Sequence, residues 1–224
     1  MNSDAYRESS GNPSPFFTVF TPVYNGEKHL HRVFRSLKEQ EFRDFEWIVI
    51  NDGSTDGSAG LIRAFLEENR DINAIFLEQS NSGKHLSWNR AVELARGKLF
   101  VPADADDFFF PDTLSFFYEK WNNLPVADRS RLSGINVLCL DNDSEDIVGD
   151  PFPVDGMLST NIDLEFRYKI RGEKWGCVRT DLLKTRPFPI IKGSHFPESW
   201  LWYHFSKRYK AICFNKPLRR YYTT

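Results

Sequence analysis

The sequence lacks the glycine-rich loops that commonly bind phosphate groups. No G-x-G-x-x-G follows the first apolar segment, and no G-x-x-x-x-G-K-[ST] occurs in the 224 residues. Dinucleotide binding of the Rossmann type and phosphoryl transfer of the P-loop type are therefore disfavoured. A ligand that carries phosphates would have to be held by other local groups or by a metal ion.

Cysteine, net charge and long apolar runs are also scarce. The three cysteines, Cys139, Cys177 and Cys213, form no C-x-x-C pair, which favours buried, reduced thiols and a cytoplasmic location over a disulfide framework or a zinc site. The formal net charge of −2 gives no general affinity for nucleic acid or for an anionic membrane. No run approaches the roughly 18 apolar residues of a transmembrane helix. Peripheral association with a membrane stays open.

What the sequence does contain is a regular alternation of strand and helix patterns in its first half. Apolar or β-branched segments at 16–21, 45–50, 74–77 and 99–102 predict strands, and each is followed by apolar residues at helical spacing, such as Leu30, Val33 and Leu37. This alternation predicts an α/β fold with a mostly parallel sheet and helices on both faces. We expect a nucleotide-binding half at 16–125, after a polar segment, 1–15, that is disordered or frayed.

The second half, 126–224, is less regular and is expected to complete the same domain. We expect strands at 135–140, 175–178, 211–214 and 218–222, a solvated acidic turn at 141–146, a short helix from Asp181 capped by Thr180, and a helix that begins at Pro197 and Glu198.

Polar residues follow each of the four strands of the first half. Tyr24, Asp52, Lys84 and Asp106 lie in the loops after the first, second, third and fourth strand. The carboxyl ends of parallel strands meet at one edge of the sheet, and ligands bind there at the point where the strand order reverses. The four side chains are therefore predicted to share one site.

The fourth strand ends in three carboxylates, Asp104, Asp106 and Asp107. Acids this close repel one another unless a cation lies between them, and carboxylates select a hard divalent ion. Mg²⁺ or Mn²⁺ held in this way usually completes its shell with phosphates of the substrate. The alternative is a solvated acidic turn.

Four segments, in this order and spacing, closely resemble the family-2 glycosyltransferases of GT-A fold. They are T-P-V-Y-N-G-E at 21–27, F-E-W-I-V-I-N-D-G-S-T-D at 45–56, N-S-G-K-H at 81–85 and D-A-D-D at 104–107. A looser similarity to soluble bacterial members continues at 172–174, 187–189 and 196–198. Asn51 departs from the pattern, because the family usually has a first Asp there.

The resemblance implies a donor site. The nucleotide would be bound by Pro22, Val23, Tyr24, Glu27, Asp52, Gly83, Lys84, Asp104 and Ala105, and the metal ion by Asp106 and Asp107. Asp52 would bond the base, usually uracil, and Asp104 with Asp106 would form the D-x-D motif. Structural alternatives are an Asx turn at Asp52 and a solvated loop charge at Lys84. Asp56 is expected to cap a helix rather than to bind ligand.

The resemblance also places the catalytic base at Glu198. Its structural alternative is an acid that is favoured by the dipole of a helix's first turn. Glu173 and Asp181 are substitutes for this role. The indole rings of Trp175, Trp200 and Trp202 would stack on an acceptor sugar or else belong to the core.

The expected function is that of a metal-dependent, inverting glycosyltransferase. It would move a hexosyl or N-acetylhexosaminyl group from a nucleotide-sugar donor, a UDP-sugar, to a glycan or a lipid-linked sugar, as in bacterial surface polysaccharide synthesis. The absence of Q-x-x-R-W argues against a processive synthase. The alternatives are a nucleotidyltransferase, which needs a glycine-rich basic loop that 22–26 does not supply, and a non-catalytic nucleotide-sugar binder.

Overall fold

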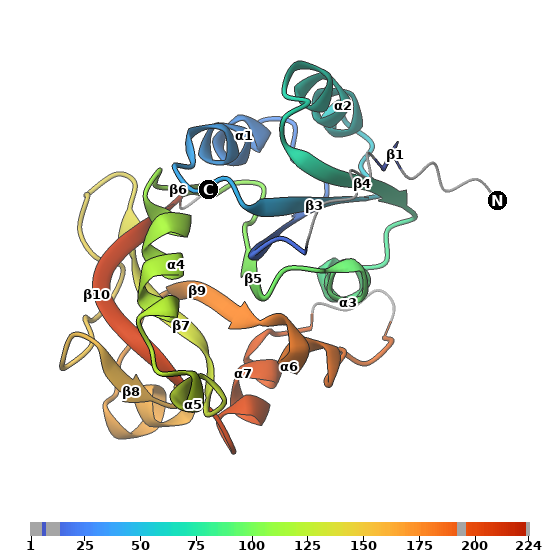
Figure 1. Cartoon of the computed structure of the whole chain (residues 1–224). Coiled ribbons are helices and arrows are strands. Elements are labelled where there is room, and N and C mark those ends of the chain that lie inside the picture. Colours follow the sequence, from blue (N-terminus) through green and yellow to red (C-terminus); the bar gives the residue numbers. More distant parts are fainter. Residues whose placement is uncertain (1–5, 8–13, 192–195, 223–224) are drawn as a thin grey trace.

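The four strands expected in the first half form the parallel part of a single mixed sheet (Figure 1). The computed structural model describes residues 6–7, 14–191 and 196–222. Strands β2 (Phe17–Val23), β3 (Phe45–Asp52), β4 (Asn73–Gln79) and β5 (Leu99–Pro102) pair in parallel in the order β4-β3-β2-β5. The order therefore reverses between β2 and β5, and the crevice beyond their carboxyl ends is where such a sheet binds ligands.

Helices cover both faces of this sheet. On one face lie α1 (Leu30–Glu39), α2 (Ser58–Glu68) and α4 (Thr113–Asn122), and on the other lie α3 (Lys84–Leu94), α6 (Thr180–Lys184) and α7 (Ser199–Phe205). Strand β3 shows why its sequence is a continuous apolar run. Trp47 and Val49 pack into the first core, and Ile48 and Ile50 pack into the second. A strand that is buried on both faces has no polar side to alternate with.

The second half extends the same sheet with mixed pairing. Here β9 (Lys174–Arg179) runs antiparallel to β5 and to β7 (Leu132–Asp141), and β10 (Lys210–Tyr221) runs parallel to β7. The short strands β6 (Phe108–Phe109) and β8 (Met157–Ser159) are both antiparallel to β10. A helical turn, α5 (Val126–Arg129), and a π-helical turn, η1 (Asp163–Arg167), complete this half.

Two glycines set the spacing between β7 and β9. A Cβ atom at Gly134 would lie 1.9 Å from the carbonyl oxygen of Cys177, and one at Gly176 would lie 1.8 Å from the carbonyl oxygen of Ile135. Neither position accepts a side chain unless the strands move apart.

Several boundaries differ from the expectations. Strand β2 continues through Pro22 to Val23. The proline is tolerated because β5 ends opposite Phe20, so the side of β2 that faces β5 has no further backbone hydrogen bonds that the missing N–H of Pro22 would disrupt. The two expected strands 211–214 and 218–222 are one strand, β10, with register shifts between Cys213 and Arg219. The short elements α5, β6, β8 and η1 were not expected.

The start of α6 is also a correction. Thr180 belongs to the helix, makes no capping hydrogen bond, and has a buried hydroxyl without a partner among the described residues. Helix α7 begins at Ser199, one residue after Glu198.

The N-terminal segment is described only in part. Tyr6–Arg7 form β1, which pairs antiparallel with β4. The expectation of an unstructured segment at 1–15 does not hold for these two residues, and residues 1–5 and 8–13 lie outside the described ones.

Other expectations are confirmed. The acidic stretch 141–146 is a turn in which Asp141 Oδ1 accepts the backbone N–H groups of Asp143 and Ser144. All three cysteines are buried and free. Within the described residues, none of the helices has the length and apolarity needed to cross a membrane.

Candidate functional site

The loops after β2 and β3 are joined by hydrogen bonds to backbone N–H groups. The backbone N–H of Asn25 donates to Ser54 Oγ at 2.9 Å, and that of Thr55 donates to Asn25 Oδ1 at 2.8 Å. Glu27 Oε2 accepts the N–H of Gly57 at 2.9 Å, at the start of α2. The carboxylate of Glu27 therefore holds two loops together, and Tyr24, with 56% of its surface exposed, lies at their rim.

Asp56 and Asn51 have structural contacts. Asp56 Oδ1 accepts the N–H of Ser58 at 3.1 Å, in agreement with the expected capping of α2. Asn51 Oδ1 accepts the N–H of Ser54 at 3.1 Å. The amide thus fulfils a turn-forming role at the position where the family pattern has an Asp.

Asp52 connects the end of β3 to the loop before α3. Its side chain is 3% exposed; Oδ1 accepts hydrogen bonds from Gln79 Nε2 at 2.7 Å and from the N–H of Ser82 at 2.9 Å, and Oδ2 accepts the N–H of Gly83 at 2.8 Å. Gly83 has a φ of 95°, a conformation that glycine adopts without strain. Asp52 therefore fixes the loop that carries Lys84.

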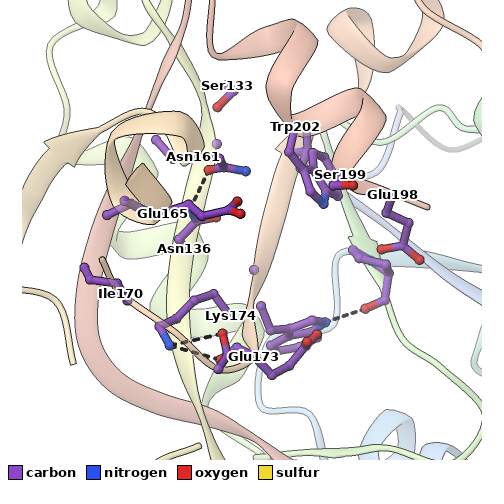
Figure 2. Close-up of a pocket in the computed structure, with 18 of the residues that line it drawn as sticks. Ser133, Asn136, Asn161, Glu165, Ile170, Glu173, Lys174, Glu198, Ser199 and Trp202 are labelled. Atoms are coloured by element: carbon purple, nitrogen blue, oxygen red, sulfur yellow. Dashed lines mark hydrogen bonds between the residues drawn. The ribbon is translucent and has the colours of Figure 1, made fainter. Parts of the chain in front are cut away.

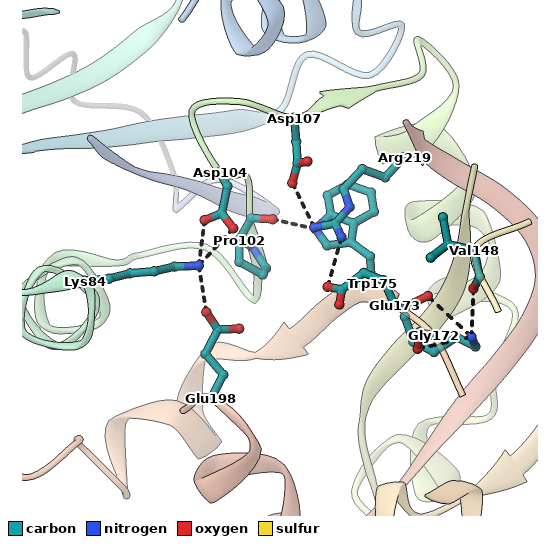
Figure 3. Close-up of polar contacts among 11 residues, drawn as sticks. Lys84, Pro102, Asp104, Asp107, Val148, Gly172, Glu173, Trp175, Glu198 and Arg219 are labelled. Carbon is teal, nitrogen blue, oxygen red and sulfur yellow. Dashed lines mark hydrogen bonds and ion pairs between the residues drawn. The ribbon is translucent and has the colours of Figure 1, made fainter. Parts of the chain in front are cut away.

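Lys84 bridges two carboxylates from distant parts of the chain (Figure 3). Its Nζ lies 2.8 Å from Asp104 and 2.8 Å from Glu198 Oε1. Burial alone would lower the pKa of Lys84, but the charges of Asp104 and Glu198 raise it well above its ordinary value. Burial likewise opposes ionisation of Asp104, yet Lys84 holds the pKa of this carboxyl below its ordinary value. Lys84 is thus a permanent cation between the donor-side loop and the start of α7, rather than a solvated loop charge.

A second ion-pair cluster lies behind the acidic loop. Arg219 of β10, 4% exposed, contacts Asp107 Oδ2 at 2.9 Å and Glu173 Oε1 at 2.9 Å. Burial raises the pKa of Asp107 to about 7, against the opposing effect of Arg219. Arg219 is the cation that keeps the pKa of this buried carboxyl from rising further.

Asp106 is placed differently from its two acidic neighbours. Its backbone carbonyl accepts a hydrogen bond from Arg32 Nη1 at 2.9 Å, and its half-buried side chain lines the cleft described below. No hydrogen bond or ion pair to its carboxylate is found within the described residues.

The carboxylates near Asp106 suit the coordination of a hard divalent metal ion only in part. Within 6–7, 14–191 and 196–222, no three or more His, Cys, Asp or Glu side chains gather in a way that could hold a metal ion. Carboxylate oxygens from one or two residues, completed by phosphate oxygens and water, are nevertheless a common way of binding Mg²⁺. Asp106, with Asp107 beside it, fits that second arrangement.

These groups border a cleft of about 1470 Å³ between the two halves of the sheet. Lys84, Asp104, Asp106 and Asp107 are among its lining residues. Figure 2 shows Glu198 and Trp202 of the α7 region on one wall, and Asn136, Asn161 and Glu165 on the wall opposite. The amide groups of Asn136 and Asn161 are joined by a hydrogen bond of 3.3 Å. Polar groups from five separated segments thus converge on one cavity.

Residues 18–134 match the sequence model of the family described as glycosyl transferase family 2. The chain belongs to this family.

Relatives support the assignment over most of the chain. An uncharacterized glycosyltransferase of Haemophilus influenzae is 32% identical over 186 residues, which cover 81% of this chain and 69% of that protein. The chain spans only 14% of one further curated relative and 15% of another.

Solved structures confirm the GT-A fold. TarS of S. aureus (residues 1–349), in complex with UDP-GlcNAc, superposes with a TM-score of 0.68 at 22% identity and covers 93% of this chain and 58% of its own. The mannosyltransferase PcManGT of Pyrobaculum calidifontis, in complex with GDP-Man and Mn²⁺, gives 0.64 at 23% identity over 97% and 58%.

In this family-2 chain the expected site residues fall into two groups. Lys84, Asp104, Asp106, Asp107 and Glu198 line the cleft. The others lie beside it, at the carboxyl ends of β2, β3 and β5 or in the loops that follow these strands and β4: Pro22, Val23, Tyr24, Glu27, Asp52, Gly83 and Ala105.

The alternative candidates for the base, and likewise the three tryptophans, differ in whether they line the cleft. Glu173 lines the cleft but is paired with Arg219, whereas Asp181 lies outside the lining and accepts a hydrogen bond from Arg179 Nε at 3.0 Å. Trp175 and Trp202 line the cleft, and Trp200 packs against the core through Phe188.

Asn136, Asn161, Glu165 and Arg219 are among the lining residues that were not anticipated from the sequence. The sequence around Arg219 has an ordinary strand pattern, and the partner residue Asp107 is more than a hundred residues away along the chain. No local signal points to this pair.

Proposed function

We propose that this family-2 protein transfers a sugar from a nucleotide-sugar donor, a UDP-sugar, to a hydroxyl group of a glycan or lipid-linked acceptor, with inversion at the anomeric carbon. The observation that carries the proposal is the Lys84 bridge. It brings the D-x-D residue Asp104 and the expected base Glu198 to the same cleft, each 2.8 Å from one ammonium group. Surface polysaccharide synthesis is the proposed context.

The donor is proposed to lie over the crevice between β2 and β5. Its base would contact the loop held by Asp52 and the rim at Tyr24, and its diphosphate would approach Lys84 and Asp106. The complexes of TarS with UDP-GlcNAc and of PcManGT with GDP-Man and Mn²⁺ support a donor of this class. A Mn²⁺ or Mg²⁺ ion held by Asp106, with Asp107 beside it, would neutralise the charge that develops on the leaving diphosphate.

Glu198 is proposed as the general base. The acceptor oxygen forms a bond to the anomeric carbon, the bond from that carbon to the phosphate oxygen breaks, and the electron pair leaves with the nucleoside diphosphate. The proton of the attacking hydroxyl passes to Glu198. Both cleft glutamates are ion-paired, Glu198 with the half-exposed Lys84 and Glu173 with the buried Arg219, and the family resemblance favours Glu198; Asp181 lies outside the cleft.

Two alternatives make different predictions. A nucleotidyltransferase would use a glycine-rich basic loop after β2, and residues 22–26 do not form one. A non-catalytic binder needs no carboxylate at the acceptor side, whereas Glu198 lines the cleft within reach of Lys84.

A donor panel tests the proposal. The protein is incubated with UDP-Glc, UDP-Gal, UDP-GlcNAc and GDP-Man in the presence of Mn²⁺ or Mg²⁺, and release of the nucleoside diphosphate is measured together with binding by thermal shift. We expect binding and slow metal-dependent hydrolysis of one donor, with no pyrophosphate released. Binding without turnover for every donor and for added acceptor glycans would favour the non-catalytic binder, and pyrophosphate release would favour the nucleotidyltransferase.

A further inference from the structure

One surface next to the cleft is both apolar and cationic. The π-helical turn η1 exposes Ile162 and Phe166, which are 37% and 64% accessible, and Tyr168 follows at 39%. The Phe166 ring lies 6.3 Å from the ring of Tyr203 in α7, so the exposed aromatic groups reach the wall of the cleft. Phe166 and Tyr203 both line that cleft.

Six cations belong to the same two segments of the chain. Three lie in or after η1, two lie in the turn after α7 and one begins β10: Arg167, Lys169, Arg171, Lys207, Arg208 and Lys210. The two segments are adjacent because the N–H of Asn161 donates to Ser206 Oγ at 3.0 Å. We call the six cations together with Ile162, Phe166 and Tyr168 the η1 surface.

The charge of the η1 surface is only partly compensated by nearby acids. All six cationic side chains are exposed, and none takes part in an ion pair within the part of the chain that the structure describes. Three acids lie close to the six cations: Asp163 and Glu165 in η1, and Asp150, whose carboxylate accepts the N–H of Arg171 at 2.9 Å, so the cations remain in excess. Slight burial and the charges of Arg186, Lys207 and Arg208 also lower the pKa of His204.

We propose that the η1 surface docks the protein on an anionic lipid bilayer. Exposed aromatic and aliphatic groups enter the headgroup region, and lysine and arginine beside them are attracted to anionic lipids. The chain as a whole carries a net charge of −2, so this attraction is local to one face and orients the molecule. A second copy of the chain is a poor occupant, because it would bring six like charges against these six.

Docking in this way has a consequence for the acceptor. The cleft opens beside the η1 surface through Phe166, Lys169 and Tyr203. A sugar carried on a membrane lipid would therefore enter the cleft from the bilayer side and reach Glu198. This consequence rests on the proposed function, whereas the docking itself does not.

Vesicle sedimentation tests the docking. The protein is mixed with vesicles of phosphatidylcholine alone or of phosphatidylcholine with phosphatidylglycerol, and we expect binding to the second kind only, weakened by salt. Lys207→Glu with Arg208→Glu should weaken binding at least about 30-fold. The matched control, Lys38→Glu with Arg70→Glu, makes the same change in net charge on exposed positions of α1 and the α2–β4 loop, and should bind like the wild type.

The apolar part is tested separately. Phe166→Ser should weaken vesicle binding about tenfold, whereas Val126→Ser, at a position that is 77% exposed on α5, should not. Failure to sediment with phosphatidylglycerol vesicles would overturn the proposal, as would equal losses in the two charge-reversal variants. A dimer in analytical ultracentrifugation that dissociates on Phe166→Ser would assign the surface to self-association instead.

The outcome is separable from that of the proposed function, since sedimentation needs neither donor nor acceptor. Lys207 and Arg208 do not line the cleft, and their double variant should hydrolyse the donor at the wild-type rate.

Discussion

The two halves of the molecule hold their functional groups in different ways. In the first half, 16–125, the loops after β2, β3 and β4 are fixed through backbone N–H groups, which donate to Glu27, Asn25 and Asp52. In the second half, 126–224, the charged groups that reach the cleft are held by ion pairs with distant side chains, namely Glu198 with Lys84 and Arg219 with Asp107 and Glu173. Backbone anchoring suits a site whose ligand is always the same, whereas ion pairs can exchange partners when a charged ligand enters.

The largest effect is expected at the one cleft carboxylate for which no partner is found within the described residues. Asp106→Ala should abolish Mn²⁺-dependent UDP binding and lower transfer by about 1000-fold or more, because the metal ion proposed at this site would lose its protein ligand. Thermal unfolding should stay at the wild-type temperature. Calorimetric titration of UDP with and without Mn²⁺ measures the effect, and Asp128→Ala, an exposed acid in α5, is the control. Unchanged metal-dependent affinity would remove Asp106 from the site.

The next effect concerns the acceptor side alone. Glu198→Gln should lower kcat by about 10² to 10⁴-fold while UDP affinity changes little, because an amide cannot take the proton of the acceptor hydroxyl. Glu173→Gln, at the other cleft glutamate, should retain most of the transfer activity. Single-turnover assays with saturating donor separate the two variants. Normal transfer by Glu198→Gln, with a large loss in Glu173→Gln, would reassign the base.

Stability distinguishes the buried ion pair from the half-exposed one. Arg219→Met should lower the free energy of unfolding by about 3–5 kcal/mol, because Asp107 is left buried without a counter-charge. Lys84→Met should cost about 1 kcal/mol or less, since its partners Asp104 and Glu198 are one-third exposed and screened by water. Urea denaturation of both variants measures the contrast. Equal losses would show that burial does not separate the two clusters.

The smallest effects come from a pair of matched threonines. Thr18 in the first half donates to Glu46 Oε1 at 2.7 Å and accepts the N–H of Gly97 at 2.9 Å, so Thr18→Val should cost about 1–3 kcal/mol. Thr180 in α6 has a buried hydroxyl without a partner in the described residues, so Thr180→Val should be neutral or stabilise by up to about 1 kcal/mol. Thermal unfolding of both variants is the measurement. A large loss at Thr180 would show that its hydroxyl makes a stabilising hydrogen bond in the folded protein.

The parts of the fold that could be predicted from sequence are those with a local cause. Strands β3 and β4 and helices α1 and α3 follow from apolar runs and helical spacing, both of which act over a few residues. The shared edge of Tyr24, Asp52, Lys84 and Asp106 follows from parallel pairing alone. Long-range contacts could not be derived in this way. The merging of 211–214 with 218–222 into β10 depends on pairing with β7, and the burial of Arg219 depends on Asp107.

The site shows the same division. The motif at 104–107, the acid at 198 and Lys84 could be picked out by resemblance, but nothing in the sequence indicates that Lys84 pairs with Glu198. The part of the cleft wall formed by Asn136 and Asn161 could not be predicted either, because neither asparagine belongs to a recognisable sequence motif.

The close approach of β7 and β9 has a consequence for the depth of the cavity. Gly134 and Gly176 both line the cleft, and neither position can carry a side chain. Backbone atoms therefore form that part of the floor of the cleft. A larger residue at either position would reduce the depth of the cleft and force the two strands apart. Attempts to re-engineer this chain for a bulkier acceptor should leave the floor untouched and alter the rim.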